Sequence, residues 1–258
     1  MTPAPRLASL CLAITLIAGS LPLPDLPSGT GPPPPGIESL TPRPPGGPSS
    51  PGDGMEDVRP TDWFYRYVRL GIRHGYLRGA DGGRFEPFRQ ITRGEFITML
   101  GRTHAALGGE IHYEWDYGPT LIYTDINPYG FYIPYLLWAT DIGIVQGDME
   151  NRFRPNVPIT REELALITVR YIDTYALYNY LWDRFQERGL YSDEALIAPW
   201  AWREAHLLRN FGFMEGSPGI NPQPGVYHFR PRDPTLRLEA AAILGRLFEA
   251  QYEATPTI

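Results

Sequence analysis

Three arginines occupy equivalent places in the sequence, and each could hold an anion. Arg93 and Arg161 lie in the motif Thr-Arg-x-Glu, and Arg237 lies in a looser copy of it. At the first position of a helix a cation is mildly unfavourable, by roughly 0.3–1 kcal/mol, so its repeated use suggests a function. An arginine fork beside free helix-start N–H groups suits a small anion such as a carboxylate. In the alternative interpretation, each arginine pairs with a nearby glutamate: Glu95, Glu163 or Glu239.

Aromatic and glycine residues recur at fixed places around these motifs. Trp63, Phe131 and Trp200 stand at the predicted start of a helix, where their rings could either stack on a sugar or fill the core. Gly79, Gly82, Gly83 and Gly147 lie in loops, where glycine permits positive φ and close approach of a ligand. A plain turn requirement explains these glycines equally well. The simplest role for the recurring aspartates is in turns or caps, and these are Asp57, Asp125 and Asp193.

An internal repeat explains these spacings. Residues 57–102 align without a gap on residues 125–170, and 13 of the 46 pairs are identical. A divergent third copy runs from Asp193 to about Arg246, with a longer loop rich in proline and glycine. Repeats of this length that cannot bury their own apolar faces stack on one another, so we expect the three copies to share one core.

Each copy is predicted to be a helix, a loop and a second helix. Apolar residues at helical spacing mark the first helix, and Thr92 with Glu95 forms a capping box at the start of the second. Thr160 and Glu163 repeat that box, whereas Leu236 replaces the threonine in the third copy. We expect the second helix of copy two to continue to Trp182. The predicted fold class is therefore all-α.

The N-terminal part of the chain is predicted to be a targeting segment and a spacer. Arg6 precedes an apolar run at 7–18, and small residues follow, which is the layout of a secretory signal peptide over 1–20. Residues 21–54 are dominated by Pro, Gly and Ser, which predicts a disordered, semi-rigid spacer. Later stretches are too polar to cross a membrane, so we expect the exported chain to have no transmembrane segment.

Charge and residue usage argue against several functions. All 23 basic residues are arginine, and the net charge of -6 argues against nucleic-acid binding. The single cysteine, Cys11, lies in the predicted signal peptide, and the five histidines form no paired metal-ligand motif. The repeats leave no room for a catalytic domain. We therefore expect no enzyme activity, no metal site and no cofactor.

The motif order Asp-Val, Trp, Gly-x-x-x-Gly, Phe-x-Pro and Ile-Thr-Arg-x-Glu resembles the S-layer homology (SLH) domain family, over roughly residues 55–248. The resemblance implies three tandem repeats in a pseudo-threefold bundle with short irregular loops and grooves between repeats. The implied boundaries are 55–122, 123–190 and 191–248, with a tail at 249–258.

The same resemblance implies a secreted protein of the cell wall or envelope. Its expected role is non-covalent anchoring, through secondary cell-wall polysaccharide that is attached to peptidoglycan and often carries pyruvate ketals. Other envelope proteins are further candidate partners. The alternative is a structural or protein-interaction module that has lost glycan binding. The candidate ligand-binding residues are Arg93, Arg161, Arg237, Trp63, Phe131, Trp200, Gly79, Gly147, Glu95 and Glu163.

Overall fold

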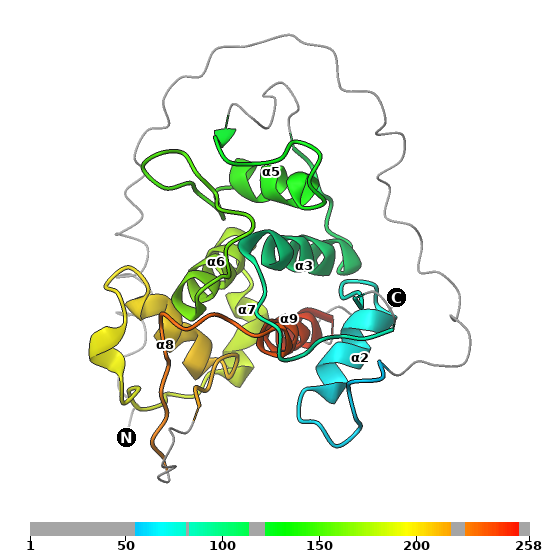
Figure 1. The fold of residues 1–258 in the computed structure, drawn as a ribbon. Helices are drawn as coiled ribbons and strands as arrows, with labels where there is room; N and C mark the ends of the chain where they lie inside the picture. Colours follow the sequence, from blue (N-terminus) through cyan, green and yellow to red (C-terminus); the bar gives the residue numbers. More distant parts are fainter. Residues whose placement is uncertain (1–54, 81–82, 114–121, 218–224, 253–258) are drawn as a thin grey trace. The chain divides into compact units, whose positions relative to one another are not determined.

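The computed structural model describes residues 55–80, 83–113, 122–217 and 225–252, which all belong to one compact unit. The predicted signal peptide, the predicted spacer and the last residues of the predicted tail lie outside the described residues. Within that part, the α-helices are α2 (Tyr65–Arg73), α3 (Arg93–Ala106), α5 (Ile133–Asp141), α6 (Arg161–Thr174), α7 (Tyr178–Leu181), α8 (Trp202–Asn210) and α9 (Arg237–Tyr252). Two short 3-10 helices, η1 (Trp182–Arg184) and η2 (Glu194–Leu196), complete the elements (Figure 1). The described residues form no extended sheet, so the predicted all-α fold class is confirmed.

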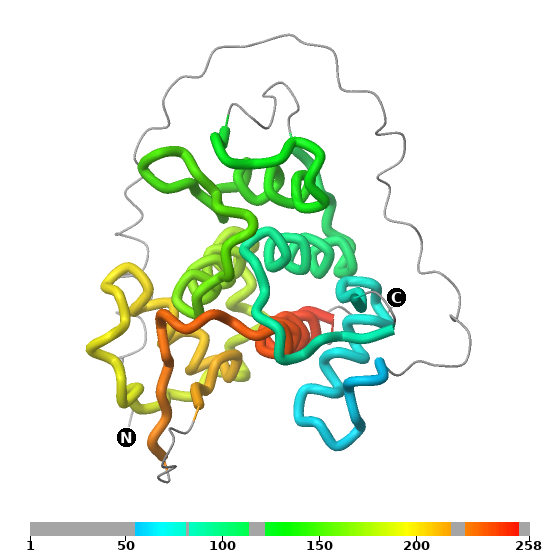
Figure 2. The backbone as a smooth tube through the Cα atoms, viewed as in Figure 1, coloured from blue at the N-terminus to red at the C-terminus, as the bar shows by residue number. Residues whose placement is uncertain are grey.

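Helices pair across the predicted units rather than within them. The first helix of each unit packs on the second helix of another: α2 on α9, α5 on α3 and α8 on α6 (Figure 1). Figure 2 shows the same arrangement, with the red α9 beside the blue-green α2 at the two ends of the described chain. The first and third units therefore meet directly. This pairing of helices does not by itself establish pseudo-threefold symmetry of the whole bundle, which stays a prediction.

The second helices begin around one junction that is closed by backbone hydrogen bonds. The amide of Ile91 donates to the carbonyl of Thr235, 3.1 Å away. Ile159 donates in turn to Ile91 at 3.0 Å, and Thr235 donates to Ile159 at 2.8 Å. Each unit is thus bonded to both others, just before α3, α6 and α9 begin.

Local sequence signals explain where these helices start. Thr92 and Thr160 cap α3 and α6 in complete capping boxes with Glu95 and Glu163, which confirms that prediction. At α9 the hydroxyl is missing, but the Glu239 carboxylate still accepts from the Leu236 amide at 2.9 Å. The third unit therefore keeps the glutamate half of the box.

The prediction that α6 continues to Trp182 is wrong. The helix ends at Thr174, and Ala176 adopts a left-handed φ of 49°. The Leu177 amide then bonds back to the Ile172 carbonyl, and the Ala176 amide bonds to that of Asp173. This is the Schellman arrangement that ends many helices, formed here without glycine. The chain resumes as the separate short helix α7.

Candidate functional site

Three aspartates hold the loop that precedes each second helix. Asp125 accepts hydrogen bonds from the amides of Phe153 at 2.9 Å and Arg154 at 2.7 Å. Asp57 and Asp193 make the same pair of bonds in the other units. The residue after each phenylalanine has a left-handed backbone, with φ between 56° and 59° at Glu86, Arg154 and Arg230. The aspartates therefore hold a strained loop. The sequence predicted a role in turns or caps, which describes this arrangement only in part.

Each motif arginine reaches into a neighbouring unit. The Nε of Arg93 donates to the carbonyl of Phe153 at 2.8 Å, and its guanidinium lies 5.0 Å from the centre of that ring. Its Nη1 lies 2.9 Å from a carboxylate oxygen of Glu163. Arg93 thus contacts backbone, ring and carboxylate of the second unit, and the acid partner comes from a unit other than its own.

The other two arginines make corresponding contacts. Arg161 donates to the carbonyl of Phe229 at 2.6 Å and forms a close ion pair with Glu239. Arg237 lies over the ring of Phe85 at 4.8 Å and 3.9 Å from Glu95. In this structure each motif arginine therefore lies near a glutamate, as the alternative interpretation predicted. In all three cases the glutamate belongs to a different unit.

Free helix-start amides, which the anion-site hypothesis required, are absent at α3. The Arg93 amide donates to the carbonyl of Val157 at 3.0 Å, and the Gly94 amide donates to that of Pro155 at 2.9 Å. The next amide, of Glu95, is capped by the Thr92 hydroxyl. The first amides of α6 and α9 are occupied in the same manner. That part of the prediction is wrong, because loops of neighbouring units cover the helix starts.

One open groove gathers candidate residues from all three units. It has a volume of about 450 Å³, and we call it groove A. Arg93 lines it from the start of α3, Gly147 from the loop after α5, and Glu163 from the start of α6. Trp200, two residues before α8, completes this set. Four residues that the sequence analysis selected separately thus lie around one cavity.

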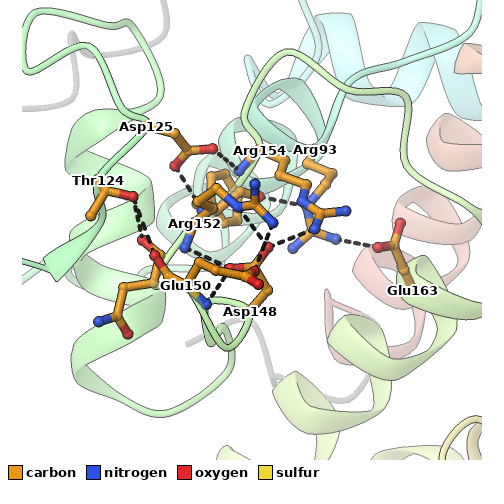
Figure 3. Close-up of polar contacts among 10 residues, drawn as sticks. Arg93, Thr124, Asp125, Asp148, Glu150, Arg152, Arg154 and Glu163 are labelled. Carbon is orange, nitrogen blue, oxygen red and sulfur yellow. Dashed lines mark hydrogen bonds and ion pairs between the residues drawn. The ribbon is translucent and has the colours of Figure 1, made fainter.

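Groove A carries excess positive charge. Its charged lining comprises four arginines and two acids, an excess of two positive charges in a chain whose net charge is -6. These residues are Arg93, Arg152, Arg154, Arg170, Asp148 and Glu163. Asp148 pairs with both Arg152, at 3.1 Å, and Arg154, at 2.6 Å. Figure 3 shows the resulting cluster, with Arg93 and Glu163 on one side of Asp148 and Arg152.

The sequence analysis missed Arg152, Arg154, Asp148 and Arg170 as groove residues. Arg152 and Arg154 flank Phe153 in the printed sequence, and the alternation Arg-Phe-Arg is the one local signal that could have drawn attention to them. Asp148 follows Gly147 directly. Arg152, Arg154 and Asp148 lie in the loop that Asp125 helps to hold, whereas Arg170 comes from α6.

The three recurring aromatic residues are exposed rather than part of the core. The exposed fraction is 58% for Trp63, 59% for Phe131 and 48% for Trp200. In each unit the helix begins two residues later, and the residue between is buried. Core packing therefore does not explain these rings, whereas contact with a ligand would. Of the three, only Trp200 is in the lining of groove A.

Among the loop glycines, φ is positive at Gly83, at 76°, but not at Gly79 or Gly147, and Gly82 lies outside the described residues. Gly79 and Gly147 are instead close to other side chains. A Cβ atom at Gly79 would lie 2.8 Å from the Met55 side chain, and one at Gly147 would lie 2.9 Å from Tyr123. These glycines are required by close packing instead.

Arg161 is the least accessible of the three arginines. Only 4% of the residue is exposed. Burial lowers the pKa of its guanidinium, and the charge of Glu239 acts in the opposite direction. An external anion would have to displace Glu239 from a covered position to reach it. Arg93, which lines groove A, is therefore more accessible to a ligand than Arg161.

No group of three or more His, Cys, Asp or Glu residues in the described part of the chain is arranged to hold a metal ion. Among the helices described, none is both long enough and apolar enough to span a membrane.

The fold and groove define a class: a helical repeat protein with a charged, aromatic-lined groove where its units meet. Residues 55–97 and 122–165 each match the S-layer homology domain. Two segments of the chain therefore match this family, which confirms the resemblance in the first two predicted units. The two matches fall in the first two predicted units and end within α3 and α6.

Similar proteins include a surface-layer protein, an anchoring protein and an enzyme. The chain is 26% identical over 191 residues to a surface-layer 125 kDa protein of Lysinibacillus sphaericus, covering 74% of this chain and 14% of that protein. It is 23% identical over 178 residues to a cellulosome-anchoring protein of Acetivibrio thermocellus, covering 67% and 35% respectively. An endoglucanase of a Bacillus strain is 25% identical over 196 residues, covering 75% and 18%.

The chain thus spans a small part of the length of these relatives. What is shared with the endoglucanase is under a fifth of that enzyme. The family match and the names of the surface-layer and anchoring relatives together support attachment to the cell surface.

Proposed function

We propose that the chain is a non-catalytic module that anchors non-covalently to the cell wall by binding an anionic polysaccharide in groove A. The expected ligand is a secondary cell-wall polysaccharide attached to peptidoglycan, with carboxylates such as those of pyruvate ketals. This role requires export to the cell envelope. The observation that carries the proposal is the meeting of an exposed tryptophan and an excess of arginines in one groove.

The two sides of groove A suit the two parts of an acidic sugar. An exposed indole ring such as that of Trp200 offers a flat apolar face on which a pyranose can stack. Guanidinium groups bind carboxylates through paired, charge-assisted hydrogen bonds. The volume of about 450 Å³ falls within the range of small-molecule sites and would admit a few sugar units.

Within the groove, Arg152 and Arg154 are better placed to meet the ligand than Arg93. Their side chains are 42% and 51% exposed, whereas that of Arg93 is 13% exposed and already paired with Glu163. A ligand carboxylate would compete with Asp148 for the first two arginines. Arg93 then acts mainly by holding the wall of the groove in place.

A wall-binding experiment tests this proposal. Purified protein is sedimented with cell walls before and after the secondary polymer is stripped. Trp200→Ala should weaken binding about tenfold, as expected for the loss of a ring contact worth about 1.4 kcal/mol. Tyr129→Ala is the control, because it removes an exposed ring that is neither a candidate ligand-binding residue nor part of the lining of groove A.

The second arm of the experiment neutralises Arg152 and Arg154 as Gln, with folding checked by circular dichroism. Loss of sedimentation in this variant and on stripped walls supports a glycan anchor at groove A. Equal sedimentation of every protein on both kinds of wall would overturn the proposal. That result would favour the alternative, a module that binds an envelope protein, to which the internal pairing of the motif arginines gives some support.

A further inference from the structure

Trp200 reaches groove A from a tight turn just before α8. The carbonyl of Ala198 accepts from the amide of Ala201 at 2.9 Å, which closes the turn and makes Pro199 and Trp200 its two central residues. Pro199 has no amide hydrogen, and the amide of Trp200 donates no hydrogen bond within the described residues. The orientation of the indole ring therefore depends in large part on what holds the first residue of the turn, Ala198.

The amide of Ala198 is held by a carboxylate of another unit. Glu162, the second residue of α6, accepts from this amide at 3.3 Å through its Oε2. Only 8% of Glu162 is exposed, so the bond is largely shielded from bulk solvent. A hydrogen bond to a charged acceptor is stronger than one between neutral groups. Glu162 thus links the start of α6 to the segment that carries Trp200.

The backbone that supports Glu162 is itself fixed. Its own amide donates to the carbonyl of Pro231 at 3.0 Å, and the preceding amide, of Arg161, donates to the carbonyl of Asp233 at 3.1 Å. The capping box of Thr160 holds the same helix start. The carboxylate therefore extends from a rigid support at the boundary between the second and third units.

Only the second unit has an acid at this position. The repeat aligns Glu162 with Gly94 in the first unit and Leu238 in the third, each directly after the motif arginine. Neither of these side chains can accept a hydrogen bond. The capping boxes at the starts of α3 and α6 use Glu95 and Glu163 instead. The carboxylate of Glu162 is therefore required neither by the repeat nor by helix capping.

The facing residue explains why a long side chain fits at this boundary and not at the first. A Cβ atom on Gly94 would lie 3.1 Å from the ring of Tyr132, the residue before α5, which leaves little room for a side chain there. In the third unit, buried Ala201 takes the place of that tyrosine before α8. The smaller residue leaves room for the side chain of Glu162.

We propose that Glu162 is a positioning residue for groove A, which fixes the turn that presents Trp200 to the ligand through the amide of Ala198. Within the described part of the chain, Glu162 is not among the residues that line the groove, so it acts on the ligand through Trp200. This inference rests on the proposed function, in which the indole ring stacks on a sugar. A ring held in one orientation loses less conformational freedom on binding than a mobile ring does.

Fluorine NMR of protein labelled with 5-fluorotryptophan reports on the surroundings of this ring without any ligand. The chain has six tryptophans, and the resonance of Trp200 is assigned by its loss in Trp200→Phe. Glu162→Leu introduces the residue of the third unit and removes the acceptor, whereas Glu162→Gln keeps a side-chain oxygen for the Ala198 amide. We expect the Leu variant to shift the resonance of Trp200 and not that of the buried Trp138. The Gln variant should leave both in place.

Sedimentation with cell walls measures the consequence for binding. Glu162→Leu should weaken binding about three- to tenfold, and the upper limit is the loss expected for Trp200→Ala, which removes the ring altogether. Glu162→Gln should bind within about twofold of the unaltered protein. A merely structural role of Glu162 would lower stability without this difference between the two variants. If Glu162→Leu proves poorly folded by circular dichroism, Glu162→Ala replaces it in both measurements.

The proposal is overturned if the resonance of Trp200 stays in place in Glu162→Leu, if Glu162→Gln shifts it equally, or if the resonance of Trp138 shifts as well. It is also overturned if Trp200→Ala weakens wall binding and Glu162→Leu does not. If Trp200→Ala has no effect on wall binding, the proposed function fails. The fluorine measurement then still decides whether Glu162 holds the ring, so the two failures are distinguishable.

Discussion

Arg93 and Glu163, which belong to different units, form an ion pair with 2.9 Å between Nη1 and the carboxylate. Glu163 simultaneously closes the capping box of α6 by accepting from the Thr160 amide at 3.0 Å. One glutamate thus stabilises its own helix start and holds the arginine of another unit. The Thr-Arg-x-Glu motif is therefore a connector between units as well as a cap.

The first prediction concerns this connection. In a double-mutant cycle with Arg93→Gln and Glu163→Gln, the two losses of unfolding free energy should be non-additive by about 1 kcal/mol, since both groups are partly exposed to solvent. Urea unfolding of the four proteins measures this coupling. Simple additivity would show that the pair contributes nothing beyond its separate contacts.

A second prediction contrasts Arg161 with Arg93. Arg161 is buried, and its replacement by Gln leaves the largely covered Glu239 with an incomplete set of partners. We expect Arg161→Gln to cost about 3 kcal/mol, clearly more than Arg93→Gln. Thermal unfolding, monitored by circular dichroism, measures which variant loses more stability. Equal losses would mean that Arg161 is solvated in solution.

Helix capping supplies the third prediction. The Thr92 and Thr160 hydroxyls each accept from the amide three residues later, so replacement by Ala should lower the unfolding free energy by about 1 kcal/mol. Thr174→Ala, at the exposed end of α6, is the matched control and should change it little. A similar effect at all three positions would point to a cause other than capping.

The fourth prediction is a loss of stability in acid. Burial acts to raise the pKa of Asp57, but hydrogen bonds from the amides of Phe85 and Glu86 outweigh it and hold the pKa below the ordinary 3.8. For Glu95, burial is likewise outweighed, by Arg89 and the Thr92 amide, and the pKa falls below 4.5. A carboxyl with a lowered folded-state pKa stabilises the fold above its unfolded pKa, and that contribution disappears as pH falls through the folded value.

Burial also lowers the pKa of His74, His104 and His206 below the ordinary 6.5, so the unfolded chain takes up protons first as pH falls. We therefore expect the free energy of unfolding to decline below about pH 6.5 and to decline further in acid, where the carboxylates are protonated. Chemical denaturation across this range measures the decline. Asp57→Asn should lower stability at pH 7 and flatten the curve in acid, because the variant has one carboxyl fewer to protonate. A curve with the same slope in the variant would rule out Asp57 as a contributor.

A fifth prediction tests the packing of helices across units. A Cβ atom on Gly101 of α3 would lie 2.4 Å from the ring of Tyr135 in α5. Gly101→Ala should therefore cost about 1–3 kcal/mol through overpacking, despite the better helix propensity of alanine. Adding Tyr135→Leu should recover part of the loss. If Gly101→Ala stabilises the protein, the two helices are less closely packed than in this structure.

The local features of the fold could be predicted from sequence because their causes are local. The capping boxes at Thr92 and Thr160 involve residues three positions apart, and helical periodicity is visible within one helix. The end of α6 escaped prediction because Ala176 has no intrinsic preference for a left-handed backbone. Its conformation is maintained by hydrogen bonds to Asp173 and from Leu177 back to Ile172.

For the candidate site, too, some features could be predicted from the sequence and others could not. The repeat identified residue types that recur, and Arg93, Gly147, Glu163 and Trp200 do line one groove. Their assignment to a common groove was not available from sequence, because they come from three units and lie up to about a hundred residues apart. The contributions of Arg152 and Arg154 depend on a loop conformation that Asp125 maintains from a distance.

By itself, the sequence determined the helical class of this protein, its repeated units and the starts of its second helices, since each follows from periodicity or from contacts within a few residues. Only the tertiary structure decided which unit each arginine faces, that the helix-start amides are covered, and that the recurring aromatic rings are exposed. Those properties arise from contacts between distant segments, whose geometry depends on how all the units pack together.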